Sequence, residues 1–152
     1  MAANSHARAA TRARSVARKL ALQALYQWQL NAQPWQELHQ QFGASEDMER
    51  ADREYFRELL ERVVAGRDAL DAEIAPSVDR PLATLDPVEH AVLLIGAYEL
   101  QSRPDVPFRV VINEGVELAR RFGATDGHKF VNAVLDRMAA RLRPEERSSP
   151  AH

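Results

Sequence analysis

Apolar residues in this chain recur at steps of three and four positions along most of its length, and this spacing constrains the fold more than any other feature. Such spacing places side chains on one face of an α-helix, whereas a half-buried strand needs alternation at every second position. No segment of four to eight residues alternates convincingly, and the β-branched run at 110–112 leads straight into a helical pattern. The sequence therefore predicts an all-α protein of six or seven helices.

The clearest predicted helix follows Asp86. Asp86 stands at the cap position, Pro87 at the first helical position and Glu89 three residues past the cap, which together are typical of a helix start. The turns that follow, up to Leu100, are the most apolar of the chain, so we predict that this helix is central. In this pattern Glu89 has an ordinary role as a capping carboxylate.

Cap and stop residues place the other helices and the divisions of the chain. The helices are predicted from Thr11 or Ser15 to Leu30, from Trp35 to Phe42, from Ser45 to Pro76 with a bend at Gly66, from Pro107 to a left-handed Gly123, and from Thr125 or Asp126 onward. We expect one domain over residues 12–142, with halves at about 12–76 and 86–142 on either side of the irregular segment 77–85, a flexible basic arm at 1–11 and a flexible tail at 143–152.

Positive charge is concentrated at the beginning of the chain. Five of the 20 lysines and arginines precede residue 37, whereas none of the 22 acidic residues does. Segregated charge of this kind favours binding to a polyanion such as nucleic acid, although a solvated basic tail that serves only solubility is the simpler alternative. The residues concerned are Arg8, Arg12, Arg14, Arg18 and Lys19.

Composition argues against several other classes of protein. The absence of cysteine excludes disulfides and thiolate metal sites and fits an intracellular protein, and no apolar run is long enough for a membrane span. The five histidines lack metal-ligand spacing, the six glycines form no phosphate-binding loop, and no serine has the flanking glycines of a nucleophile elbow. We therefore expect a non-catalytic protein without a metal or cofactor.

A second candidate for a binding segment is Thr125–Asn132, where His128 and Lys129 fall in the first turn of the last predicted helix. The free N–H groups and partial positive charge of a helix start suit a phosphate, and a lysine there adds to this. The spacing of Phe130 favours the core, but near a helix start the ring can also be exposed and stack on a base. Together with the arginines, this segment indicates single-stranded RNA binding.

Four segments carry a resemblance to a known family. The chain reads RARSVARKLALQALYQWQL, then DPVEHAVLLIGAYEL, then RPDVPFRVVINEGVELARRFG and finally DGHKFVNAVLDRMA, within residues 12–140. In order and spacing these segments resemble the signatures of the bacterial transcription antitermination factor NusB family. The resemblance implies two three-helix halves with an appended short helix. It also implies a cytoplasmic protein that binds boxA RNA with the small-subunit ribosomal protein NusE and joins RNA polymerase, NusA and NusG to suppress termination in ribosomal RNA synthesis.

The resemblance also assigns residues by position. The RNA-binding positions of the family fall on Arg12, Arg14, Arg18, Asp126, Lys129 and Phe130, and Arg8 joins them as part of the same arm. Tyr26 and Glu89 match positions at the face that contacts the protein partner. The chain departs from many relatives at Gly127, where they have Ser, and from some at Ala83 and Thr84, where they have acidic residues.

Two alternatives differ in class from an antitermination factor. A similar domain stands at the front of certain ribosomal RNA cytosine methyltransferases, so the chain could be an RNA-engaging domain without the catalytic part. A helical adaptor with arginines for solubility is the other alternative. Binding of boxA-like RNA, measured with and without the protein partner, discriminates among the three.

Overall fold

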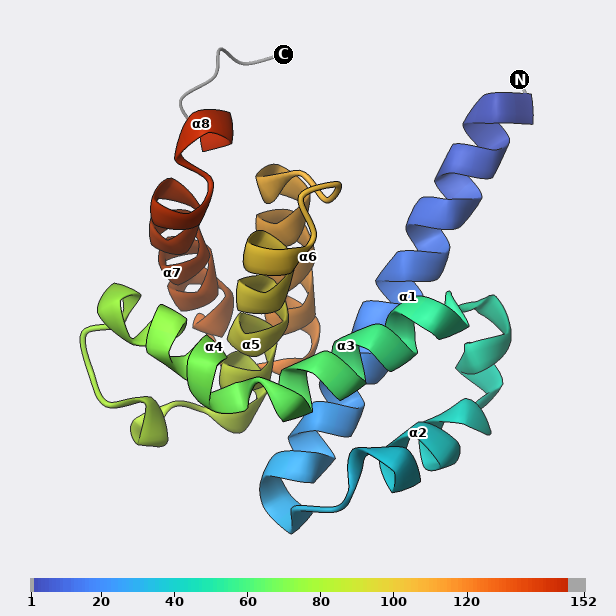
Figure 1. Cartoon of the computed structure of the whole chain (residues 1–152), viewed down its shortest axis with the longest axis horizontal. Helices are drawn as coiled ribbons and strands as arrows, with labels where there is room; N and C mark the ends of the chain where they lie inside the picture. Colours follow the sequence, from blue (N-terminus) through green and yellow to red (C-terminus); the bar gives the residue numbers. More distant parts are fainter. Residues whose placement is uncertain (1, 148–152) are drawn as a thin grey trace. The chain divides into compact units, whose positions relative to one another are not determined.

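A computed structural model of the chain (Figure 1) describes the backbone of residues 2–147 and the side chains of residues 5–147. Throughout this part of the chain every regular element is helical, which confirms the all-α fold class. The α-helices are α1 (Ala2–Asn31), α2 (Trp35–Gly43), α3 (Arg53–Ala65), α4 (Arg67–Ile74), α5 (Pro87–Ser102), α6 (Phe108–Phe122), α7 (Gly127–Leu142) and α8 (Pro144–Arg147), and the 3₁₀ turns are η1 (Glu46–Arg50), η2 (Ala75–Ser77) and η3 (Leu82–Thr84).

The chain forms two compact units, residues 1–65 and residues 66–152. The division falls at Gly66, so the predicted boundary at 77–85 is wrong, and that segment belongs to the second unit. Gly66 does more than bend the predicted third helix, because the helical path stops there and resumes as α4. Glycine is a poor residue for a helix interior, which explains why the break falls at this position. The flexibility predicted for residues 1–11 stays a prediction.

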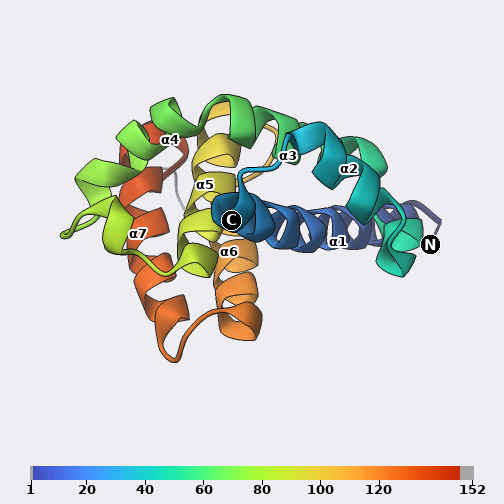
Figure 2. The ribbon, with the colours of Figure 1, turned by 90° about the horizontal axis from the view of Figure 1, so that it is seen from below.

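In the first unit α1 packs against α2 and α3 (Figure 2). The apolar stripe of α1 supplies part of the core, and Leu20 and Leu25 are fully buried together with Leu38 of α2 and Phe56 of α3. A backbone hydrogen bond of 2.9 Å, from the N–H of Asp52 to the carbonyl oxygen of Ala13, also ties α1 to the residue before α3. The middle of α1 is therefore part of a packed structure.

Helix α1 begins much earlier than the sequence predicts. It is helical from Ala2, and Thr11 does not cap it. Instead the Thr11 hydroxyl donates a hydrogen bond of 2.9 Å to the Ala7 carbonyl one turn back, as serine and threonine do inside helices. Because alanines separate the basic residues in this segment, helix propensity is high and the arginines are carried on a helix.

The start of α3 also differs from the prediction. Ser45 caps only the short turn η1, where its side chain accepts the Asp47 N–H. The helix proper begins at Arg53, after Asp52, whose carboxylate accepts the Tyr55 N–H at 3.0 Å. Two good capping residues therefore lie seven positions apart in sequence, and the second one starts the long helix.

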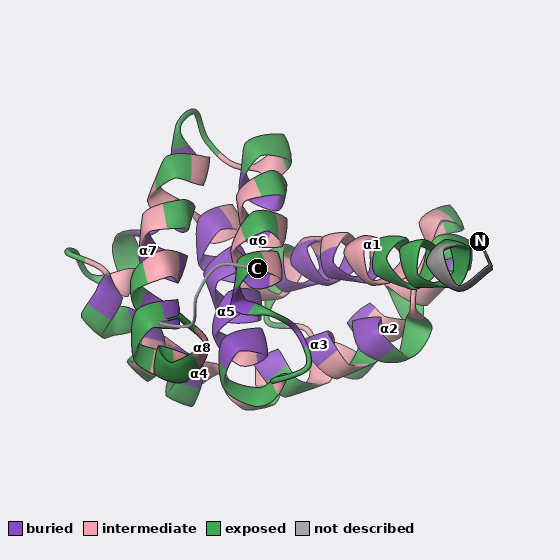
Figure 3. Cartoon of the chain, turned by 90° about the horizontal axis from the view of Figure 1, so that it is seen from above, coloured by how far each residue is buried: buried purple, intermediate pink, exposed green. Residues whose placement is uncertain are grey.

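In the second unit α5 packs against α4, α6 and α7, and Figure 3 shows it buried along nearly its whole length. The predicted start is confirmed, since the Asp86 carboxylate accepts the N–H groups of Val88 and Glu89 at 2.9 and 3.3 Å. A side chain at Gly96 of α5 or Gly115 of α6 would lie within 2.7 Å of a Leu135 methyl group. The absence of these side chains lets the three helices pack closely.

The turn between α6 and α7 differs from one prediction and agrees with another. Gly123 ends α6 in an extended conformation and not a left-handed one, and a side chain there would meet the Ala119 carbonyl oxygen at 2.7 Å. The left-handed residue is Asp126, with φ of 64°. It occupies the cap position of α7 as predicted, yet its side chain makes no capping hydrogen bond. Aspartate tolerates this backbone conformation better than most residues do.

The predicted flexible tail is in part firmly held. The Arg143 guanidinium donates hydrogen bonds to the carbonyl oxygens of Leu100, Glu99 and Arg103 at 2.7 to 3.0 Å. Glu146 of α8 accepts the Phe108 N–H at 3.0 Å and an Arg143 hydrogen bond at 2.6 Å. Residues 143–147 thus close the ends of α5 and α6, which corrects the prediction for them, and residues 148–152 lie outside the described part.

Candidate nucleic-acid interface

The arginines of α1 differ strongly in accessibility. Arg8 and Arg12 are exposed and therefore available to a ligand. Arg14 is half-buried, with its guanidinium 4.5 Å from the Tyr55 ring centre and its Nε 3.9 Å from the Asp52 carboxylate. Arg18 is 3% exposed, and its guanidinium lies 5.4 Å from the same ring.

This gradient revises the expected site. A guanidinium inside the packed unit cannot reach an RNA phosphate without leaving its cation–π contact. Arg18 instead holds α1 against α3, and of the arginines predicted to bind RNA only Arg8, Arg12 and part of Arg14 are accessible. Sequence spacing did not show this, because the tyrosine that covers the arginines lies on another helix.

Lys19 is also neutralised within the first unit. Its ammonium group lies 2.6 Å from the Asp47 carboxylate, which also accepts a 2.6 Å hydrogen bond from Arg50. The Lys19 hydrogen bond is the main cause that holds the pKa of Asp47 below its usual range, and Arg50 adds to the effect. The positive charge of α1 that remains open to solvent is therefore concentrated before Arg14.

The second candidate segment lies at the start of α7. Lys129 and Asp126 are both exposed, and the ammonium and carboxylate groups form a loose ion pair of 3.4 Å. Since Asp126 does not cap the helix, its carboxylate is directed at the lysine and not at the backbone. An exposed pair of this kind contributes little to stability, so a phosphate can compete for the lysine at small cost.

Phe130 is neither core nor fully exposed. Its ring is half-buried, and the Arg80 guanidinium lies 4.5 Å from the ring centre. The sequence left open whether Phe130 is core or exposed; its neighbour Val131 and Val134 are fully buried, whereas Phe130 is not. Sequence reasoning missed Arg80, which lies in the irregular segment 77–85 and has no local pattern that relates it to Phe130.

Glu89 lies beneath the turn that leads into α7. It is 5% exposed, its carboxylate accepts the Ala124 N–H, and a side chain at Gly127 would meet its Oε2 at 2.2 Å. Burial raises the pKa of Glu89 and the charge of Asp86 adds to the rise, whereas the Ala124 hydrogen bond and the charge of Arg80 oppose it. The role of Glu89 at a partner face stays a prediction. In the structure its carboxylate supports the turn between α6 and α7 by accepting the Ala124 N–H.

Tyr26 is exposed, with 39% of its surface accessible. Leu30, one helical turn further along α1, is 58% exposed and is the other large exposed apolar residue of the described chain. Residues four apart share a helix face, so the two form a small apolar patch. An apolar residue at the last turn of a helix is unremarkable in sequence, and Leu30 was missed for that reason.

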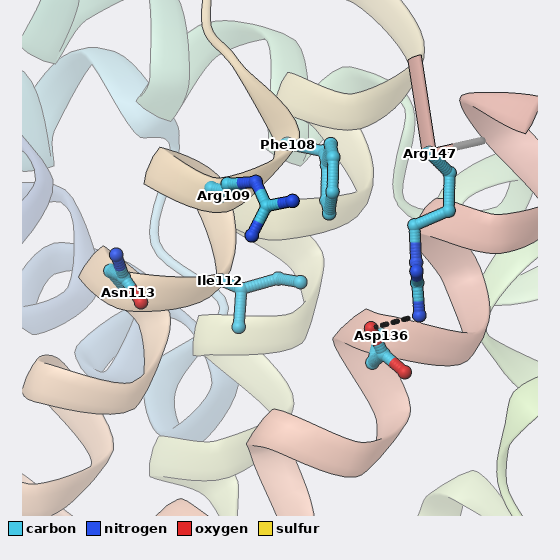
Figure 4. Close-up of a pocket in the computed structure, with 6 residues that line it drawn as sticks. All are labelled: Phe108, Arg109, Ile112, Asn113, Asp136 and Arg147. Atoms are coloured by element: carbon cyan, nitrogen blue, oxygen red, sulfur yellow. Dashed lines mark hydrogen bonds and ion pairs between the residues drawn. The ribbon is translucent and has the colours of Figure 1, made fainter. Parts of the chain in front are cut away.

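A pocket of about 350 Å³ lies among α6, α7 and α8. Figure 4 shows the residues that line it: Phe108, Arg109, Ile112, Asn113, Asp136 and Arg147. Arg147 is paired with Asp136 at 2.8 Å, so much of the charge in the pocket is balanced internally. Asn113 stands at this pocket and is exposed. In the described residues no group of three His, Cys, Asp or Glu could hold a metal ion, and no helix there could cross a membrane.

An all-helical fold with exposed arginines, an arginine–phenylalanine stack beside a lysine and a separate apolar patch is typical of proteins that bind nucleic acid and a protein partner. Residues 15–140 match the model of the NusB family, and the chain belongs to that family. This is a family of transcription antitermination proteins that are not enzymes.

The comparisons agree in sequence and in structure. The chain is 53% identical over 135 residues to the transcription antitermination protein NusB of Marinomonas sp. (strain MWYL1), covering 88% of this chain and 78% of the relative. It resembles the structure of T. maritima NusB with a TM-score of 0.75 and 29% identity, over 88% of this chain and 94% of that one. A crystal structure of NusB and NusE in complex with dsRNA matches with a TM-score of 0.68 and 26% identity, over 84% and 96% of the chains.

Proposed function

We propose that this protein binds boxA RNA together with the ribosomal protein NusE, and so helps RNA polymerase to read through terminators during ribosomal RNA synthesis. The observation that carries the proposal is the similarity to a NusB that was crystallised with NusE and RNA. The exposed basic residues of the two candidate segments support it. NusA and NusG complete the assembly, and the site of action is the cytoplasm.

The RNA side of the proposal consists of the exposed part of α1 and the start of α7. Arg8 and Arg12 supply charge to phosphates, and Lys129 adds to it beside the half-exposed Phe130. The two segments belong to different compact units, and we propose that each of them contributes contacts to RNA. Asp126 contributes by fixing the left-handed turn and by holding Lys129 near the helix start.

The partner side consists of Tyr26 and Leu30. Exposed aromatic and aliphatic side chains on one helix face are common anchors of protein interfaces, because their burial removes apolar surface from water. Glu89 would help by supporting the turn before α7. Replacing Tyr26 by Asp should abolish NusE binding and leave the intrinsic RNA affinity unchanged.

A titration of labelled RNA tests the proposal. Single-stranded boxA RNA, a scrambled strand and a boxA duplex are each titrated with the full-length protein, with and without NusE, at several salt concentrations. We expect boxA binding to be tightest with NusE present and to weaken steeply as salt rises, because neutralised phosphates release counterions. Equal affinity for boxA and scrambled RNA, unchanged by NusE, would exclude the proposed function.

The variants follow from the accessibility of the arginines. Joint replacement of Arg8 and Arg12 by Ala should reduce the slope of log K against log salt by about 1.4 for single-stranded RNA, if each contacts one phosphate. The melting temperature should stay unchanged, since both side chains are exposed. The matched control replaces the exposed Arg53 and Arg62 of α3, which removes the same charge from another helix. An equal loss of affinity in the control would show that Arg8 and Arg12 contribute only through the net charge of the protein.

A further inference from the structure

The stack of Arg80 on Phe130 is a feature of the second unit that the proposed function has not used. Arg80 is exposed, and its guanidinium carbon lies 4.5 Å from the centre of the half-buried Phe130 ring. It makes no ion pair with any residue in the described part of the chain, although the charge of Glu89 reaches it. The hydrogen-bond donors of the guanidinium thus remain open to a ligand.

The backbone holds Arg80 in place over the ring. Arg80 lies between the turns η2 and η3, and the following Pro81 favours an extended backbone at Arg80. On one side the Arg137 guanidinium of α7 donates a 2.8 Å hydrogen bond to the Ser77 carbonyl. On the other side Leu85 is buried, which anchors the end of the segment. The side chain therefore projects from a fixed loop toward the first turn of α7.

Lys129 adds a second cation beside the stack. It is adjacent to Phe130 in the first turn of α7, it is exposed, and its partner Asp126 holds it loosely. A strand that meets this surface finds a planar cation lying over an aromatic ring, with a flexible ammonium group next to it. Single-stranded RNA offers the matching chemistry, because its unpaired bases have free faces and its phosphates are negatively charged.

We propose that Arg80 is an RNA-binding residue, whose guanidinium plane is held over Phe130 so that an unpaired base stacks on its outer face. The inference rests on the proposed RNA-binding function and adds a residue and a contact to it. A guanidinium already placed on the ring loses less conformational entropy on binding than a free arginine does. Bases within a duplex are stacked on one another, so the contact selects single strands.

The test compares Arg80→Ala, Arg80→Lys and the control Arg109→Ala in the full-length protein, with boxA RNA as a single strand and as a duplex. Arg109 is a matched control, since it is also exposed and its guanidinium lies 5.2 Å from a phenylalanine ring, that of Phe108. We expect Arg80→Ala to weaken binding of the single strand about tenfold, as the loss of one stacked base does, and Arg109→Ala to weaken it less than twofold.

Arg80→Lys separates stacking from charge. Lysine keeps the positive charge but not the plane, so we expect it to bind the single strand nearly as weakly as Arg80→Ala and the duplex as well as the unchanged protein. Full recovery by Lys, or equal losses for Arg80→Ala and Arg109→Ala, would overturn the inference. The melting temperatures of all variants should agree, because Arg80 is exposed and its substitution removes no contact from the core.

A second measurement does not depend on substitution. The Nε–Hε resonance of Arg80 in the unchanged protein should shift when single-stranded boxA RNA is added, and it should not shift with the duplex. If the unchanged protein prefers boxA to scrambled RNA and this resonance stays in place, the inference fails and the proposed function stands. If the protein shows no preference for boxA, the proposed function fails first.

Discussion

Replacing Arg143 by Ala should destabilise the second unit far more than its position near the end of the chain implies. Arg143 donates to three backbone carbonyl oxygens, those of Leu100, Glu99 and Arg103. The side chain is 10% exposed, and Leu100 and Glu99 are almost fully buried. The substitution therefore leaves the buried Leu100 carbonyl without the Arg143 donor, whereas the carbonyls of Glu99 and Arg103 keep the N–H groups of Arg103 and Val106 as donors.

The expected magnitude follows from these bonds. A hydrogen bond to a charged group contributes about 1.5 to 3 kcal/mol, and the low end applies here because the bonds share one side chain and water reaches some of the carbonyls. Three bonds at about 1.5 kcal/mol each give a loss of at most about 4.5 kcal/mol, a large part of the roughly 5 to 15 kcal/mol that stabilises a typical domain. For a chain of this size the melting temperature should fall by roughly 10 °C.

Urea unfolding followed by circular dichroism measures the change, and hydrogen exchange locates it. The amides of the last turn of α5 should exchange faster in Arg143→Ala, whereas those of α3 should not change. The control is Arg147→Ala, which removes an exposed ion pair with Asp136 and should cost less than about 1 kcal/mol. If Arg143→Ala is no more destabilising than the control, the carbonyl hydrogen bonds do not hold the end of α5.

The remaining predictions concern two carboxylates. Gly127→Ala places a Cβ 2.2 Å from the Glu89 carboxylate, so the Glu89 side chain must move and the free energy of unfolding should fall by about 1 to 2 kcal/mol. In a Glu89→Ala background the same substitution should cost less. An equal cost in both backgrounds would rule out the contact with Glu89 as the cause. Asp47 has a lowered pKa in the folded protein, because Lys19 and Arg50 favour its charged form. Its contribution to stability is present above the usual pKa of about 3.8 and is lost as the pH falls through the lowered value. Asp47→Asn should therefore be less stable than the unchanged protein at neutral pH, and the difference should vanish at strongly acidic pH; a difference that is constant with pH would contradict this.

Helix starts with local signals were predictable from sequence. Asp86 and Pro87 set the start of α5, Pro107 that of α6 and Asp126 that of α7, because the capping residues and the helix they start are neighbours in the chain. The start of α1 was not predictable in this way, since the alanine-rich segment before Thr11 lacks a strong stop signal. Ser45 competed with Asp52 for the start of α3, and no local rule ranks the two.

The candidate site was predictable by type of residue and not by accessibility. The arginines of α1 and the residues at the start of α7 stood out in the sequence, but burial of Arg18 depends on Tyr55 of α3. Arg80 meets Phe130 through contacts between segments far apart in sequence, and Arg143 does the same with the end of α5. Long cationic side chains contact hydrogen-bond acceptors and aromatic rings on segments that are distant in sequence. The spacing of residues along one helix does not reveal these contacts.

The hydrogen bonds from α7 to α4 and to the segment that follows it have a consequence for mutational scans. Arg137 donates to the Ser77 carbonyl, and Arg141 donates to the backbone and carboxylate of Glu73. These bonds fix α4 and the start of the loop that carries Arg80 to the same helix that carries Phe130. A screen for loss of RNA binding will therefore return substitutions at Arg137 and Arg141 that touch no nucleotide. Such substitutions should weaken RNA binding as much as the loss of a direct contact does, but they should leave the salt dependence of binding unchanged. The salt dependence therefore distinguishes residues that support the loop from residues that contact RNA.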